Sequence, residues 1–315
     1  MSRRIELKNE FLAASVIPDA GGHITELVDL RTGRNWLWSN PAIPITEQRT
    51  AEDYGRELDS GGWDEILFSI TPFTLTTSDG AQHAIRDHGD LIRRHWAVHD
   101  WHEGDRVLSM SVSGDTLDYR FGRVITLAEN SPRIIIDYTF ANNGDFAWPL
   151  YWCAHALLDV DADTTIRIDG SPPYRVEGPV NEFPRGGTVP HWPLLRDRKA
   201  RTVDLSQCFS DSKDDMAFAC KLFVKTPDNG CVSVHHSNGH ESLTMHMDGA
   251  VLPWLGLWVN NGGWSGCDAE PYRNLGLEPS IAAYDSVGDA IGSNAIPWIE
   301  PGETRRWKLN LELTA

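Results

Sequence analysis

The sequence predicts an all-β protein, a large antiparallel β-sandwich, and three observations support this prediction. Short runs rich in β-branched and aromatic residues recur along the 315 residues, bounded by Gly, Pro, Asn and Asp, as strands and turns require. Helical periodicity is nearly absent. The run at 306–313 alternates strictly, because Trp307, Leu309, Leu311 and Leu313 share one face and polar side chains share the other. Such a strand covers a core on one side only.

The expected strands follow this pattern along the whole chain. No Gly/Ser linker or repeat divides the sequence, so we expect a single domain over residues 1–315. Two long irregular stretches, 40–62 and 172–215, are of a length that is unusual unless a loop is functional. We expect them to wall a cleft. The expected strands are 11–17, 24–30, 66–70, 91–99, 106–112, 119–127, 133–141, 150–160, 164–168, 217–225, 231–235, 243–247, 255–259, 275–277 and 306–313.

The charge of the chain disfavours several classes of partner. With 28 basic and 45 acidic residues the formal net charge is −17, which repels nucleic acid and anionic bilayers. Charged Glu6, Lys8 and Glu10 interrupt the first segment before an apolar stretch develops, so we expect neither a secretory signal nor a membrane span. A neutral small molecule is the better partner.

The cysteines indicate a reduced protein. Their number, five, is odd, and no CxxC pair occurs, which disfavours a disulfide framework and a thiolate zinc site. We therefore expect a cytoplasmic location. The 13 tryptophans combine flat apolar faces with N–H donors, as sugar recognition requires, although a large sandwich also buries many aromatic side chains.

Five short segments combine Gly turns, histidines and carboxylates. They are PDAGGHI at 18–24, GGWDE at 61–65, DHGD at 87–90, WCAH at 152–155 and GLEP at 276–279. In this order they resemble the aldose 1-epimerase (galactose mutarotase-like) superfamily. Its members carry an N-terminal Gly-Gly turn, an early His-Gly, a mid-chain His and a late Glu before a closing PGE strand, here at 301–303. The resemblance spans nearly the whole chain and implies a galactose mutarotase-like sandwich.

The resemblance also implies a set of catalytic roles. Opening a cyclic hemiacetal requires a group that takes the O1 proton and a group that protonates the ring oxygen, so a carboxylate and an imidazole suffice. By resemblance, Glu278 is the general base, His155 the general acid, and His88 a hydrogen-bond partner of the ring oxygen or a neighbouring hydroxyl. This chemistry needs no cofactor and no metal.

Each of these residues also has a plain structural alternative. Glu278 precedes a proline that ends a strand, where a salt-bridged glutamate is as common as a catalytic one. His155 stands in the apolar run WCAHALL, typical of a hydrogen-bonded core histidine. His88 can instead cap the turn at 87–90. The resemblance favours the catalytic interpretation of all three.

The substrate contacts are expected to differ from those of the better-known members. Those carry an Arg-bearing motif and an Asn-rich approach to His-Gly, which this chain lacks, so it resembles a less characterised branch. We expect Asp64, Trp63 and Arg93 to contact sugar hydroxyls, although Asp64 can equally belong to a solvated turn. Trp258 and Asn260 share a strand face by period two, which offers a stacking plane beside an amide unless Trp258 packs in the core.

Two other clusters do not fit metal sites. The histidines of the turn near residue 237 lack the spacing of known ligand sets, and the alternating aspartates near residue 161 lack the Gly and Glu of a calcium loop. We expect a solvated loop and a charged strand end, so the sequence predicts no metal. These residues are His235, His236, His240, Asp159, Asp161 and Asp163.

The sequence thus favours an enzyme that interconverts sugar anomers, as a monomer or homodimer with a small-molecule sugar substrate. A non-catalytic carbohydrate-binding protein on the same fold is the main alternative, and a structural domain is the third. The enzyme requires His88, His155 and Glu278 to converge on one cleft. That cleft should expose the ring of at least one of three tryptophans, Trp63, Trp152 and Trp258.

Overall fold

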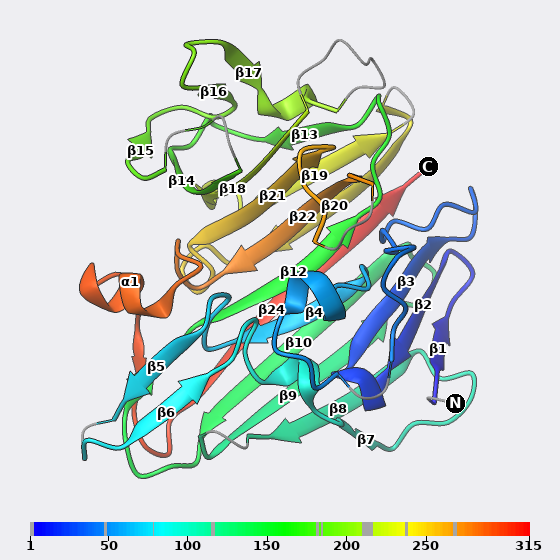
Figure 1. The fold of residues 1–315 in the computed structure, drawn as a ribbon. Coiled ribbons are helices and arrows are strands. Elements are labelled where there is room, and N and C mark those ends of the chain that lie inside the picture. Colours follow the sequence, from blue (N-terminus) through cyan, green and yellow to red (C-terminus); the bar gives the residue numbers. More distant parts are fainter. Residues whose placement is uncertain are drawn as a thin grey trace.

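The computed structural model describes residues 3–46, 49–77, 79–114, 117–180, 183, 185–209, 217–236, 239–266 and 270–315. Two large antiparallel sheets dominate it (Figure 1), which confirms the all-β prediction. The larger has ten strands in the order β1 (Ile5–Lys8), β2 (Leu12–Ile17), β3 (His23–Asp29), β4 (Trp63–Leu67), β12 (Trp152–Leu158), β22 (Arg273–Ser280), β21 (Trp254–Asn261), β18 (Phe218–Lys225), β14 (Tyr174–Val180) and β15 (Thr188–Val189).

The second sheet has eight strands, and three two-stranded sheets accompany the two large ones. Its order is β13 (Thr165–Ile168), β19 (Cys231–His236), β20 (Glu241–Met247), β24 (Thr304–Thr314), β10 (Arg133–Asn142), β9 (Tyr119–Leu127), β8 (Val107–Ser113) and β7 (Ala97–His99). Three small pairs are β5 (Phe73–Thr76) with β6 (Gln82–Ile85), β11 (Trp148–Pro149) with β23 (Trp298–Ile299), and β16 (Leu194–Arg196) with β17 (Thr202–Asp204).

Helical segments are short and few in the described chain. They are η1 (Pro18–Ala20), the π-turn η2 (Tyr54–Leu58), η3 (Leu91–Arg93), η4 (Leu205–Gln207) and α1 (Val287–Gly292). The last of these lies beside the β5–β6 hairpin (Figure 1). Over the described ranges, no helix has the length and apolar character needed to cross a membrane.

Most expected strands are present, with differences where turns interrupt an apolar run. The expected strand at 91–99 begins instead as the 3₁₀ turn η3, and only Ala97–His99 forms β7. The expected strand at 66–70 lies at 63–67, as β4. The stretch 172–215, expected to be irregular, contains β14 to β17 and η4. Strands β15 to β17 have only two or three residues each, too few for a visible period.

Along the central strands of the ten-stranded sheet, side chains alternate between the face that packs in the core and the opposite face. Trp63 and Leu67 of β4 belong to the main hydrophobic cluster together with Leu277 of β22, on the face toward the other sheet. Asp64 and Glu278 lie at the positions between, and therefore on the opposite face. That outer face carries the cavity described next.

A buried ion pair joins the two sheets. Glu65 Oε1 accepts hydrogen bonds from Arg123 Nη1 at 2.8 Å and from the Tyr138 hydroxyl at 3.0 Å, and Oε2 accepts one from Trp152 Nε1 at 3.0 Å. Burial raises the pKa of Glu65 to about 6, against the pull of Arg123. Trp152, one of the three tryptophans of which at least one was expected in a cleft, is wholly buried. Its indole fixes a core carboxylate instead.

Candidate active site

A cavity of about 350 Å³ opens on the outer face of the ten-stranded sheet. The loop before β4 and the strands β12, β18, β21 and β22 contribute its wall. Its polar and aromatic lining suits a ligand with alternating hydroxyls and apolar faces. The lining residues are Asp53, Tyr54, Gly55, Asp59, Ile70, His88, His155, Leu157, Gly178, Lys221, Trp258, Trp264, Glu278 and Asp285.

Glu278 presents one carboxylate oxygen without a hydrogen-bond partner among the described residues. Its side chain is wholly buried, and Oε2 accepts a hydrogen bond from the Lys221 ammonium, whereas Oε1 has no partner. Gly276 leaves room for Oε1, since a Cβ at this position would lie 2.4 Å from that oxygen. Burial alone would raise the pKa of Glu278, but Lys221 and His155 outweigh it and lower the pKa. The group is therefore a carboxylate at neutral pH.

His155 lies beside this carboxylate, on the neighbouring strand β12. Its Nε2 is 3.8 Å from Glu278 Oε1, and its side chain is buried. Burial lowers the pKa of His155 from 6.5 to about 4, and the charge of Glu278 offsets this effect only in part. The imidazole is therefore neutral at neutral pH in the ligand-free site.

Tyr54 connects His155 to a buried aspartate. Its hydroxyl donates to Asp64 Oδ2 at 3.0 Å and lies 3.4 Å from His155 Nδ1. Because the tyrosine proton points to the carboxylate, the phenol oxygen can only accept from His155, which places the proton of the neutral imidazole on Nδ1. Nε2 then carries a lone pair on the side of Glu278.

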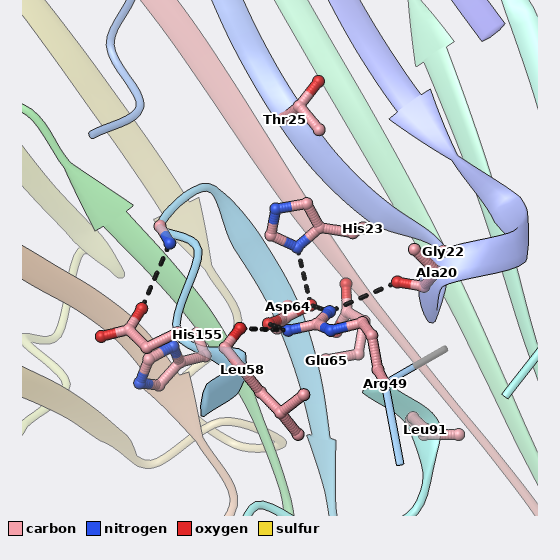
Figure 2. A network of polar contacts seen from close by, with 12 residues as sticks. Ala20, Gly22, His23, Thr25, Arg49, Leu58, Asp64, Glu65, Leu91 and His155 are labelled. Atoms are coloured by element: carbon pink, nitrogen blue, oxygen red, sulfur yellow. Dashed lines mark hydrogen bonds and ion pairs between the residues drawn. The ribbon is translucent and has the colours of Figure 1, made fainter. Parts of the chain in front are cut away.

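Asp64 is the centre of a set of polar contacts with Arg49 and His23 (Figure 2). Arg49 binds both of its oxygens, at 2.6 and 2.7 Å, and His23 Nδ1 lies 2.7 Å from Oδ1. Arg49 also donates to the carbonyl oxygens of Ala20 and Leu58, which ties the loop to the sheet. Although burial opposes ionisation, Arg49 and His23 hold the pKa of Asp64 well below its ordinary value.

His88 reaches the cavity from a tight turn. Its own φ is +56°, and a Cβ at the following Gly89 would lie 1.9 Å from the Leu67 carbonyl oxygen, so only glycine fits there. Nδ1 of His88 lies 3.0 Å from Asp87 Oδ1, and its ring stacks on Tyr54 at 3.9 Å. The His-Gly motif therefore holds one imidazole against the turn that carries Tyr54.

Two further carboxyl groups face the cavity. Burial raises the pKa of Asp59 and of Asp285 to about 6 each, and Lys221 opposes the shift at Asp285. Oδ1 of Asp285 is buried with no partner among the described residues. Such an oxygen favours a ligand that donates a hydrogen bond.

The structure thus brings His88, His155 and Glu278 to one cavity, while their chemical roles remain predictions. Four expected substrate contacts, Trp63, Asp64, Arg93 and Asn260, are placed elsewhere. Trp63 is 1% exposed and packs in the core between the sheets. Asp64 is buried beneath Tyr54 and is not a solvated turn residue.

Arg93 holds two loops together through hydrogen bonds to backbone carbonyls. Its guanidinium donates to the backbone carbonyls of Ala51, Asp87 and Gly89, at 2.7 to 3.2 Å, and so joins two loops. Arg93 is not among the residues that line the cavity. The expectation that it contacts a sugar is therefore wrong, because backbone oxygens use its donors.

Of the two residues singled out on β21, the tryptophan lines the cavity and the amide does not. Trp258 is partly exposed and lines the cavity, where it meets Trp264 edge to face at 5.4 Å. Asn260 is wholly buried, and its side chain bonds the backbone of Gly263 and Trp264. Asn260 therefore shapes the loop that carries Trp264 and does not reach the cavity.

Sequence reasoning missed several residues of the site. Tyr54 and Asp59 lie in a stretch expected only to be irregular, and the π-turn around Tyr54 leaves no periodic signal. Lys221 resembles any solvent-facing lysine of a strand. A Tyr and three acidic residues close to a Gly-Gly pair were the available signal at 53–62.

The described residues contain no group of three His, Cys, Asp or Glu side chains placed to hold a metal ion. Cys153, Cys208, Cys220 and Cys231 are free thiols, and Cys267 lies outside the described residues. The cavity chemistry available from the chain is therefore that of carboxylates, imidazoles, a phenol and an ammonium.

Comparison with solved structures gives full-length matches. A putative aldose 1-epimerase from Escherichia coli K12 matches with a TM-score of 0.68 and 15% identity, covering 99% of each chain. A galactose mutarotase related enzyme from Lactobacillus acidophilus matches with a TM-score of 0.66 and 13% identity over 99% of this chain and 98% of that one. A GalM/aldose epimerase homologue from C. elegans has a TM-score of 0.63 and 16% identity, covering 100% and 99%.

Neither a family model nor a curated protein sequence matches the chain. The structural likeness therefore rests on architecture and not on sequence identity. It shows that the chain has the galactose mutarotase-like fold, as the resemblance implied. The function has to be argued from the residues of the cavity.

Proposed function

We propose that this protein, which has the galactose mutarotase-like fold, is a carbohydrate epimerase that interconverts the anomers of an aldose. The observation that carries the proposal is Oε1 of Glu278, a buried carboxylate oxygen with no hydrogen-bond partner among the described residues, in a cavity beside two imidazoles. A buried acceptor of this kind is suited to bind a hydroxyl and to take its proton.

In the proposed reaction, Glu278 Oε1 removes the proton of the anomeric hydroxyl. The C1–O5 bond breaks as the ring oxygen is protonated, and C1 becomes a carbonyl carbon. Rotation about C1–C2 exposes the other carbonyl face, and the reverse proton transfers close the ring with the opposite configuration. A positioned acid or base contributes about 10²–10⁴ in rate to such a step.

The imidazoles of His155 and His88 border the space next to the carboxylate. Their rings meet edge to face at 5.4 Å, which gives the cavity a fixed corner. Trp258 supplies an apolar plane for the C–H face of a sugar, as tryptophan does in carbohydrate sites. The proposed substrate is therefore a pyranose held between a stacking plane and a polar corner.

The test is anomer exchange measured by polarimetry or NMR over neutral aldoses, uronic acids and sugar phosphates. Wild type should accelerate exchange over buffer for at least one sugar. Glu278→Gln keeps the shape and the hydrogen-bonding capacity but lacks the base, so it should lose at least about 10² in kcat while sugar affinity changes much less. Exchange at the wild-type rate in Glu278→Gln would contradict the assignment of the base.

A non-catalytic carbohydrate-binding protein is the alternative outcome. In that case the wild type binds sugar in a titration and leaves the exchange rate at that of buffer. A purely structural role for Glu278 would appear in Glu278→Gln as a lowered melting temperature, because Lys221 would lose its buried counterion.

A further inference from the structure

Lys221 is buried in the cavity wall together with the carboxylate it binds. Its side chain extends from β18, and its ammonium donates to Glu278 Oε2. Lys221 is 6% exposed and Glu278 is wholly buried. Two charges at this depth are tolerated as a pair and are costly alone. The pair leaves Glu278 Oε1 and the ammonium next to each other at the cavity.

Anomer exchange moves two protons, and the neutral imidazole of His155, to which the resemblance gives the acid role, has none to give at this cavity. Its proton is on Nδ1, facing the Tyr54 hydroxyl, and Nε2 holds a lone pair toward Glu278. Its pKa of about 4 leaves few protonated molecules at neutral pH. Nδ1 of His88 is likewise directed at a carboxylate, that of Asp87. Among the described lining residues, Lys221 is the permanent cation that carries protons.

We propose that Lys221 gives the proton to the ring oxygen, so that Glu278 and Lys221 act as one hydrogen-bonded acid–base pair. The inference rests on the proposed function. On ring opening, the O1 proton passes to Glu278 Oε1, the Lys221 proton passes to O5, and the electrons of the C1–O5 bond stay on O5. On closure, Glu278 returns its proton to O1 while the Lys221 amine takes the proton of the O5 hydroxyl.

The shared hydrogen bond couples the two transfers. Glu278, followed by Asp285, raises the pKa of Lys221 against the effect of burial. When Glu278 takes the O1 proton its charge disappears, so the ammonium loses its nearest counterion and gives up its own proton more readily. Asp285 remains as a counterion that lets the amine regain its proton. Cys153 also faces Lys221, and its thiol stays neutral because burial raises its pKa well above 9.

The experiment is amine rescue of Lys221→Ala on the sugar that the wild type turns over best. The variant should lose at least about 10² in kcat. Ethylammonium and 2,2,2-trifluoroethylammonium, which are similar in size and differ in acidity, should restore exchange, with the more acidic amine faster at equal concentration of its protonated form. The double variant Lys221→Ala/Glu278→Gln with the same amines gives the exchange rate that the amines produce without Glu278.

Lys221→Arg distinguishes a proton donor from a mere counterion. Arginine keeps the positive charge beside Glu278 but is too weak an acid to donate. We expect a folded variant in which the Glu278 carboxyl carbon still titrates at low pH by ¹³C NMR, with kcat reduced at least about 10²-fold. This variant, checked by thermal melting, also covers the case in which Lys221→Ala does not fold.

The outcomes separate this inference from the proposed function. Wild-type kcat in Lys221→Arg, or rescue rates that do not depend on amine acidity, would overturn the donor role while leaving the epimerase proposal intact. A wild type without anomer exchange on any sugar would overturn both.

Discussion

The hydroxyl oxygen of Tyr54 lies 3.4 Å from Nδ1 of His155. The same hydroxyl donates to Asp64, and the same ring stacks on His88. One side chain in a single π-turn therefore orients both imidazoles of the cavity.

Tyr54→Phe should separate orientation from stability. The substitution keeps the stacked ring and removes the acceptor of His155 Nδ1–H, so the imidazole tautomer is no longer fixed. We expect kcat to fall about tenfold with KM little changed, because an imidazole that carries its proton on Nε2 would donate to Glu278 Oε1 and weaken the proposed base. Anomer-exchange kinetics and ¹⁵N shifts of His155 are the measurements.

Tyr174→Phe is the matched control for this variant. Its hydroxyl donates to the Leu194 carbonyl at 2.7 Å, and Tyr174 does not line the cavity. It should cost about 1 kcal/mol of stability and leave kcat unchanged. Equal kinetics in the two variants would contradict the role of Tyr54.

Arg49→Met should strongly destabilise the protein. Arg49 and Asp64 are both buried, and removal of the cation leaves a carboxylate with only His23 and Tyr54. Breaking a buried pair in this way costs about 3–5 kcal/mol. Urea unfolding measures it. Arg49→Met/Asp64→Asn should recover part of the loss, and a double variant as unstable as the sum of the single variants would refute the pairing.

Trp258→Ala should weaken sugar binding more than turnover. Its ring is one of two partly exposed indoles that line the cavity, beside that of Trp264, and loss of a stacking face is worth about 1 kcal/mol, which raises KM five- to tenfold. Trp298→Ala is the control, since Trp298 is 44% exposed and lies outside the cavity lining. An unchanged KM in Trp258→Ala would exclude stacking on this ring.

The depressed pKa of His155 predicts a pH dependence of stability. Between pH 6.5 and about 4 the unfolded chain protonates this imidazole and the folded chain does not. As the pH is lowered through this range, the free energy of unfolding therefore decreases, by up to about 1.4 kcal/mol per pH unit from this group. Denaturant titrations of wild type and His155→Gln should converge as the pH falls, and parallel curves would contradict the shift.

The fold was predictable because buried apolar residues alternate with polar residues along many strands, which is the pattern of a sheet with one face on the core. The closing strand alternates, and Trp307, Leu309, Leu311 and Leu313 are all buried in β24 as expected. The convergence of His155 and Glu278 needed the family resemblance, since WCAHALL is buried on both faces and gives no direction by itself. Periodicity alone would have placed His155 in the core.

The remaining site residues could not be predicted for physical reasons. Trp63 and Asp64 are neighbours on a strand and therefore face opposite sides, so a motif that contains both cannot present both to a sugar. The contact of Lys221 with Glu278 spans two strand pairings, β18 with β21 and β21 with β22. A contact of that range leaves no mark in either local sequence.

The order of strands β4, β12, β22, β21 and β18 also sets when the site comes into existence. Synthesis delivers Asp64, then His155, then Lys221, and only afterwards the strand that carries Glu278. Until β22 inserts, β12 and β21 each have an unpaired edge, and Lys221 lacks its carboxylate. Glu278 therefore arrives with the last strand of the ten-stranded sheet, so this sheet and the Lys221–Glu278 pair of the cavity are completed in the same step, before β24 enters the other sheet.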